Sequence, residues 1–122
     1  MRSPLLVAAA TLALLCGVAH SYLGERYILI RLFRRTDLPH LFGSDVFTRR
    51  TLRFAWHLTS VAWWGSAAML VVLANGSARD GLRVLSVTFL ISAIVTAVGT
   101  RGRHLAWPVF LLIAIFAWIG AA

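Results

Sequence analysis

The chain has 122 residues, of which 60% are hydrophobic and only 13% charged, and its formal net charge is +8. Typical soluble domains have about 45–50% apolar and about 25% charged residues, so this composition excludes an ordinary soluble fold. The single cysteine, Cys16, excludes an intrachain disulfide and a dithiol redox mechanism within one chain. No groove-reading motif accompanies the positive charge. We therefore expect no nucleic-acid binding, and expect the arginines to contact the anionic headgroups of a lipid bilayer.

Four stretches of the chain contain no Asp, Glu or Arg, and each is long enough to cross a bilayer as a helix, which takes about 17–25 mainly apolar residues. They are residues 3–24, 54–78, 84–100 and 104–122. With their flanking helix signals they predict transmembrane helices at about residues 3–24, 51–75, 82–100 and 104–121. The predicted fold class is all-α: a polytopic membrane protein with one domain, residues 1–122, and four transmembrane helices in an antiparallel bundle.

The connections between these stretches carry start and stop signals for helices. Gly76 predicts the end of the second helix, because glycine readily takes the left-handed conformation that follows many helices. Ser77 and Asp80 have the spacing of a capping box, which predicts the start of the third helix. Residues 43–45 resemble an N-cap and predict that the second helix begins about two turns before the membrane.

Residues 25–50 form the only long connection, which we predict to be a basic cytoplasmic loop. Its first part mixes arginines with large apolar side chains, a composition typical of a helix that lies in the membrane interface. An extension of the first span beyond the hydrocarbon explains the same composition. The sequence leaves both alternatives open.

The arginines are unevenly divided between the two sides of the predicted helices. The first and third connections hold nine of them, and the other side has only Arg2, Arg79 and Arg83. Because arginine is enriched on the cytoplasmic side, we expect a bacterial inner-membrane protein with both termini in the periplasm. The alternative is a cleaved signal peptide over residues 1–19, which would translocate seven arginines against this bias.

Three histidines are predicted near the cytoplasmic ends of three different helices. At roughly 1.5 Å per residue, His20 and His57 lie roughly 6–8 Å deeper than their charged neighbours Glu25 and Arg53. They should therefore have similar depths on adjacent helices, and His104 should be shallower on the same side. Polar side chains inside a membrane are energetically unfavourable, so this histidine cluster is the strongest candidate site in the sequence.

The histidine cluster has several chemical interpretations. A copper or zinc site would use Cys16, His20 and His57, with His104 or Glu25 as a further ligand, because thiolate and imidazole suit these metals. A haem would be held between His20 and His57, with Trp64 in the pocket wall. Alternatively, the histidines only form hydrogen bonds between helices, or take part in quinone binding or proton relay. The hydroxyl partners for such hydrogen bonds would be Ser21, Thr59 and Ser60.

Two segments carry a resemblance to a group of known proteins. His20-Ser21-Tyr22-Leu23-Gly24-Glu25-Arg26, taken with Arg53-Phe54-Ala55-Trp56-His57, resembles small, uncharacterised bacterial four-helix inner-membrane proteins. The resemblance covers about the first half of the chain and implies no activity.

We expect a non-enzymatic membrane protein that acts as a subunit of a membrane-protein partner or as a homo-oligomer. The alternative is a haem- or transition-metal-binding protein in redox or metal handling. A transporter is less favoured, because none of the four acidic residues is predicted deep in a span. A passive channel formed by oligomers is also less favoured, because the outer halves of all four predicted helices are too apolar for a continuous polar track.

Overall fold

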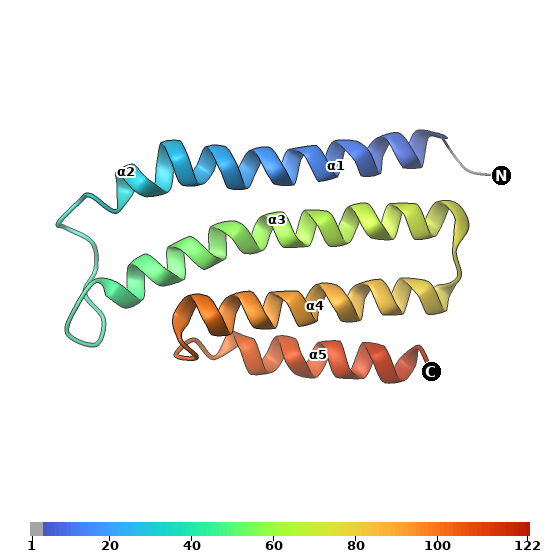
Figure 1. Cartoon of the computed structure of the whole chain (residues 1–122). Helices are drawn as coiled ribbons and strands as arrows, with labels where there is room; N and C mark the ends of the chain where they lie inside the picture. Colours follow the sequence, from blue (N-terminus) through green and yellow to red (C-terminus); the bar gives the residue numbers. More distant parts are fainter. Residues whose placement is uncertain (1–3) are drawn as a thin grey trace.

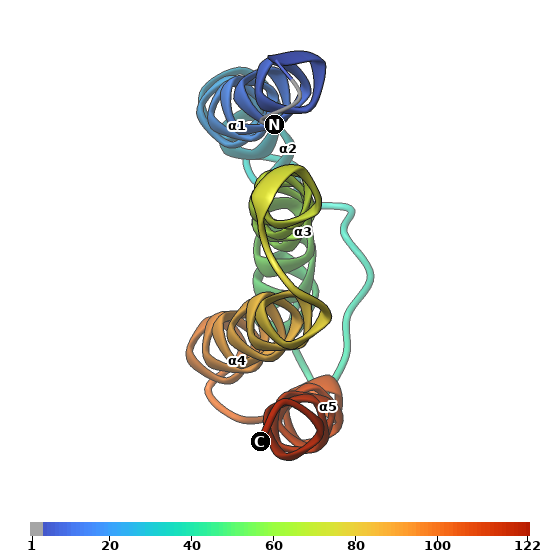
Figure 2. The same ribbon diagram turned by 90° about the vertical axis from the view of Figure 1, so that its right-hand side faces the viewer.

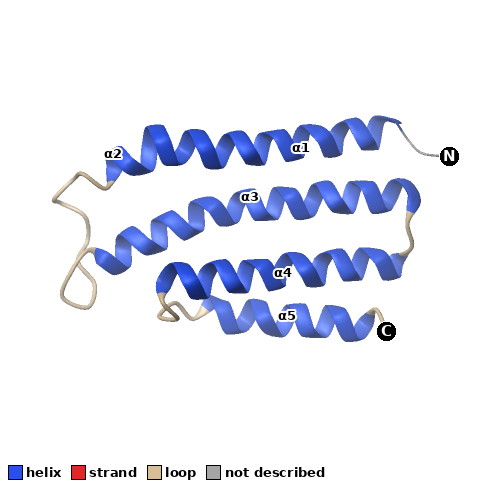
Figure 3. Ribbon diagram, viewed as in Figure 1, coloured by secondary structure: helices blue, strands red, loops and turns tan. Residues whose placement is uncertain are grey.

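A computed structural model describes residues 4–122, which form four helical rods (Figure 1). The first rod is continuous: α1 (Pro4–Leu23) passes into a π-helix, η1 (Gly24–Leu29), and then into α2 (Ile30–Leu32). The other rods are α3 (Val46–Asn75), α4 (Ala78–Thr100) and α5 (Ala106–Gly120). Within the described residues no strand is present (Figure 3), so the all-α prediction is confirmed. Arg2 and Ser3 lie outside the described residues.

Three of the four rods are long and apolar enough to cross a membrane. They are Pro4–Leu32, Val46–Asn75 and Ala78–Thr100, with 29, 30 and 23 residues. The fourth, α5, has 15 residues, which is shorter than the usual span of about 17–25. It begins at residue 106 instead of the predicted 104, because the backbone N–H of Ala106 bonds to His104 Nδ1 in a turn before the helix.

Half of the predicted loop over residues 25–50 is helical. Residues 24–32 continue the first rod, so the structure has the extended first helix and, among the described residues, no separate interfacial helix. The second predicted helix begins at Val46, five residues before 51, as the signal at residues 43–45 predicts. The non-helical connection is therefore confined to residues 33–45.

The turn between α3 and α4 confirms one capping prediction and corrects another. Ser77 Oγ accepts a hydrogen bond from the backbone N–H of Asp80, whose carboxylate accepts one from the backbone N–H of Ser77. This capping box starts α4 four residues before the predicted position. Gly76, however, has extended backbone angles, φ −104° and ψ −172°, so its predicted left-handed conformation is wrong. Left-handed residues occur instead in the turn before α5, at Arg101 and Gly102.

The rods stand in a row, each beside its neighbours in the chain (Figure 2). Within the described residues, α1 approaches α3, α3 approaches α4, and α4 approaches α5, whereas α1 does not approach α4 or α5 and α3 does not approach α5. The chain therefore does not close on itself as the expected four-helix bundle would. Small residues such as Ala10, Ala67 and Ala93 are buried between the rods, while many large apolar side chains are exposed. This pattern is compatible with lipid as the solvent.

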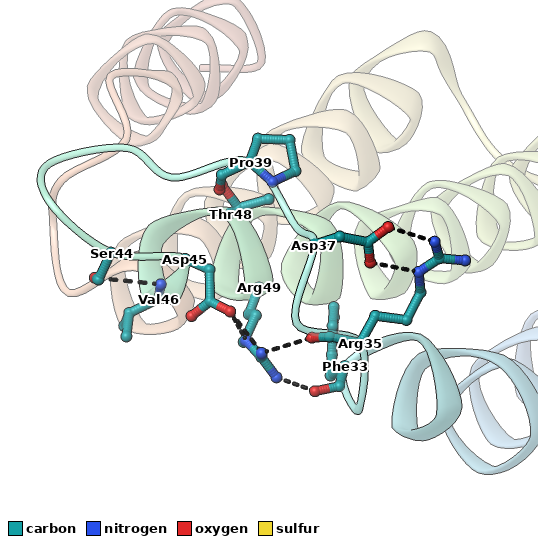
Figure 4. A network of polar contacts seen from close by, with 9 residues as sticks. All are labelled: Phe33, Arg35, Asp37, Pro39, Ser44, Asp45, Val46, Thr48 and Arg49. Atoms are coloured by element: carbon teal, nitrogen blue, oxygen red, sulfur yellow. Dashed lines mark hydrogen bonds and ion pairs between the residues drawn. The ribbon is translucent and has the colours of Figure 1, made fainter.

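Arg49 fastens residues 33–45 to the start of α3 (Figure 4). Its guanidinium donates to the carbonyl oxygens of Phe33 and Arg35, which follow the first rod, and to the Asp45 carboxylate at 2.5 and 2.8 Å. The hydrogen bond from Arg49 lowers the pKa of Asp45 below its ordinary value. In the same connection, hydrogen bonding to Arg35 lowers the pKa of Asp37 to about 2. The end that contains this loop and the turn before α5 is called the arginine-rich end below.

Candidate functional site

A connected group of polar side chains lies between the first rod and α3. Two of its members come from α1, one from η1 and three from α3. We call it the α1–α3 network, and it comprises His20, Ser21, Glu25, Arg53, His57 and Ser60. Helical spacing explains the grouping, since residues three or four apart share a helix face.

The centre of the network is a pair of serine hydroxyls. Ser21 Oγ lies 2.8 Å from Ser60 Oγ and 2.9 Å from Nδ1 of His57. Ser60 Oγ lies 3.3 Å from Nδ1 of His20. The two imidazoles are therefore joined through two hydroxyl groups, and either direction of hydrogen bonding is open to them because a hydroxyl both donates and accepts.

The outer end of the network is the carboxyl group of Glu25, which lies between a guanidinium and an imidazole. Glu25 Oε1 lies 3.0 Å from Nη2 of Arg53, and Glu25 Oε2 lies 3.1 Å from Nε2 of His57. Glu25 and His57 are each about one-third exposed, whereas Ser60 is fully buried. The network thus has a partly open, charged outer end at Glu25, a fully buried hydroxyl at Ser60 and a half-buried imidazole, His20, at its other end.

Two tryptophans from α3 fix the ring of His20. The Trp56 indole stacks on this imidazole with 4.6 Å between ring centroids, and its Nε1–H donates to the His20 backbone carbonyl at 3.0 Å. Trp63 meets the same imidazole edge-on at 4.9 Å. Gly24 makes room for Trp56, because a Cβ at that position would overlap the indole ring.

The π-helix η1 places Glu25 in this site. Ser21 and Glu25 are four residues apart, and they bind the two ring nitrogens of the same histidine, His57. Widened π turns inside α-helices occur often at functional sites. The spacing of Ser21 and Glu25 is a sequence signal that the ligand predictions did not use.

The structure brings some of the predicted metal ligands together and leaves others apart. His20 and His57 join the same network, but Cys16 is exposed, and His104 lies among aromatic rings, with ring centroids 5.2 Å from Phe54 and 6.3 Å from Phe47. Among residues 4–122, no group of three or more His, Cys, Asp or Glu side chains is placed to hold a metal ion. The predicted ligands are therefore not all gathered at one point.

The side chains predicted to bind haem already form hydrogen bonds with other residues. Both ring nitrogens of His57 have hydrogen-bond partners, so ligation of haem iron would require this side chain to release Glu25 or Ser21. The indole N–H of Trp64 donates to the Leu14 carbonyl at 3.2 Å. Haem binding stays a prediction.

The interpretation as hydrogen bonds between helices is confirmed for Ser21 and Ser60. Thr59 instead donates to the Ala55 carbonyl within α3.

Comparisons with protein-family models, curated proteins and solved structures find no match to this chain. Fold and site alone define its class: an all-helical protein with three helices long enough to span a membrane and a histidine, serine and glutamate network between the first two rods.

Proposed function

We propose that this chain is a non-enzymatic integral protein of a bacterial inner membrane, in which the α1–α3 network relays protons between the cytoplasmic surface and the membrane interior. The arginine-rich end faces the cytoplasm, both termini face the periplasm, and α5 completes a fourth, shorter span. The protein acts as a subunit of a membrane-protein partner or as a homo-oligomer. Three long apolar helices and the gathering of nine arginines at one end support this placement.

The observation that carries the relay is the unbroken hydrogen-bonded sequence from Glu25 to His20. Each group in it can both give and accept a proton, as transfer along hydrogen bonds requires. Its outer member, Glu25, is about one-third exposed, and Ser60 is fully buried between rods that lipid surrounds. Such intramembrane chains of acidic and imidazole groups suit proton relay.

Transfer proceeds by a shift of each proton to its neighbour. In the starting state Glu25 has taken up a proton from the cytoplasmic surface, and its carboxyl group donates to Nε2 of His57. His57 Nδ1–H donates to Ser21, and Ser60 accepts from Ser21 and donates to His20 Nδ1. A proton passes from Glu25 to Nε2 of His57, and every proton along the sequence then moves one position inward. His20 gains a proton at Nδ1 and releases one from Nε2. The net result is one proton carried from Glu25 past His20. Before the next transfer Glu25 takes up a proton from the cytoplasmic surface, both imidazoles change tautomer, and the hydroxyls rotate back to their starting directions.

Nitrogen-15 NMR of histidine-labelled protein in lipid nanodiscs tests the relay, with the exchange rate of the His20 ring protons as the readout. Ser21→Ala and Ser60→Ala should each slow this exchange, because they interrupt the sequence. Ser66→Ala is the matched control, since that hydroxyl donates only to the Ala62 carbonyl of its own helix. An unchanged His20 exchange rate in both network variants would refute the relay.

Cysteine labelling in intact cells tests the placement in the membrane. Cys16 is first replaced by alanine, and a single cysteine is then introduced by Thr36→Cys or by Asn75→Cys. A membrane-impermeant maleimide should label the Asn75→Cys protein and label the Thr36→Cys protein only after lysis. The opposite pattern would overturn the orientation.

The alternative of haem or transition-metal binding is favoured by one observation. Nε2 of His20 has no hydrogen-bond partner among the described residues, so this nitrogen is available to a ligand. Protein purified in mild detergent would then show a Soret band, or bound copper or zinc that His20→Ala removes. Colourless, metal-free protein would refute this alternative.

A further inference from the structure

A groove between α3 and α4 opens beside the α1–α3 network at the arginine-rich end. It has a volume of about 550 Å³. Arg49, Arg50 and Arg53 from the first turns of α3 form its charged rim, and Ile94 and Val98 from α4 contribute to its apolar wall. We call it the arginine groove.

The rim of the groove carries positive charge that the carboxylates among the described residues do not fully neutralise. Arg49 pairs with Asp45, and Arg53 pairs with Glu25. Arg50 forms no ion pair and no side-chain hydrogen bond within residues 4–122. A groove rimmed in this way is electrostatically complementary to an anionic headgroup, and arginine in particular binds phosphate oxygens through paired N–H groups.

The wall of the groove is apolar and uncovered. Ile94 and Val98 are 54% and 73% exposed, and their spacing of four residues lines them up along one face of α4. Charge at the rim and hydrocarbon along the wall match an amphiphile with one anionic head and an acyl chain. A small soluble anion would bind at the rim but leave the apolar wall uncovered. The arginine-rich end of a second copy of this chain would be repelled, because it would bring a second cluster of arginines against the first.

We propose that the arginine groove binds one anionic phospholipid from the surrounding leaflet, with the phosphate at Arg50 and an acyl chain along Ile94 and Val98. This inference rests on the proposed location in a membrane and is independent of the proton relay. His57 lines the groove and also belongs to the network. A bound phosphate therefore lies beside the network and competes with Glu25 for Arg53.

Native mass spectrometry of the detergent-solubilised protein tests the site with phosphatidylglycerol and phosphatidylcholine of identical acyl chains. One phosphatidylglycerol should remain bound in preference to phosphatidylcholine. Arg50→Gln should weaken its binding about tenfold, as expected for loss of one charge-assisted contact. Arg103→Gln, which removes an exposed arginine of the same end outside the groove, is the matched control and should leave binding unchanged.

Two further measurements separate the lipid from other occupants. Val98→Trp should also lower phosphatidylglycerol binding, because the indole fills the path of the acyl chain. Inorganic phosphate should not displace the lipid, and displacement at equal concentration would show a site for the phosphate group alone and overturn the proposal. Equal retention of the two lipids, or equal losses in Arg50→Gln and Arg103→Gln, would also overturn it. If neither cysteine variant is labelled in intact cells, the proposed location in a membrane would instead be rejected.

Discussion

Gly24 should be one of the least replaceable residues in the chain, because the indole of Trp56 occupies the space where its side chain would be. A Cβ at this buried position would lie 2.6 Å from Trp56 Cζ2 and closer still to two other atoms of the same ring. Substitution by alanine must therefore displace the indole. The displacement breaks both the stacking on His20 and the hydrogen bond to the His20 carbonyl.

The loss can be worked out from these contacts. A hydrogen bond between helices in a membrane contributes about 0.6 kcal/mol, and an aromatic stack about 0.5–1.5 kcal/mol. Forcing a methyl group into a filled space adds about 1–3 kcal/mol to this loss. Replacing glycine by alanine inside a helix reduces the loss by about 0.5–1 kcal/mol. Gly24→Ala should thus lower the free energy of unfolding by about 3 kcal/mol.

Reversible unfolding in mixed micelles of mild detergent and dodecyl sulfate, followed by tryptophan fluorescence, measures this loss. Gly81→Ala is the matched control: Gly81 is buried in α4, and a Cβ there would meet its nearest neighbour, Met69 Sδ, at an ordinary 3.4 Å. That variant should match or slightly exceed the wild-type stability. If Gly24→Ala is as stable as Gly81→Ala, the reasoning about the indole contact is refuted.

Three more outcomes are expected. Ser60→Ala should lower the free energy of unfolding by about 1 kcal/mol through two lost hydrogen bonds, and a similar loss in Ser66→Ala would contradict this. Arg49→Gln should speed amide hydrogen exchange across residues 33–45, and unchanged exchange there would show that this guanidinium does not hold the loop. The hydrogen bond from Arg49 lowers the pKa of Asp45 from 3.8. The Arg49–Asp45 pair should therefore protect residues 33–45 from amide hydrogen exchange fully above pH 3.8, and this protection should be lost as the pH falls through the lower pKa of the folded state. Loss of this protection already near neutral pH would contradict the role of the Arg49–Asp45 pair.

The sequence predicts the helices well because lipid-compatible helices require long stretches without charge. Such stretches locate α1, α3 and α4, and short-range hydrogen bonding predicts the capping box at Ser77. The early start of α3 also follows from local residues. The connection over residues 25–50 is harder to interpret, because arginine with large apolar residues suits both an interfacial helix and a longer first rod.

The candidate site could be predicted only in part. The depth of a residue along a helix follows from the number of residues that separate it from the helix end, so the sequence alone predicts similar depths for His20 and His57. Their partners depend on how two rods are rotated against each other. Local spacing alone did not predict that Ser21 and Glu25 would hold the two sides of one imidazole, or that His104 would face Phe54.

Residue type and local spacing are enough to predict that this chain is helical and apolar along its length, with its arginines concentrated in two connections. The row of rods, the π turn at Glu25, and the filling of the space beside Gly24 and Gly17 by Trp56 and Trp64 become apparent in the folded chain alone. These features arise from close contacts between residues roughly 30–50 positions apart in the chain. Such contacts depend on shape and packing, which a one-dimensional pattern does not contain.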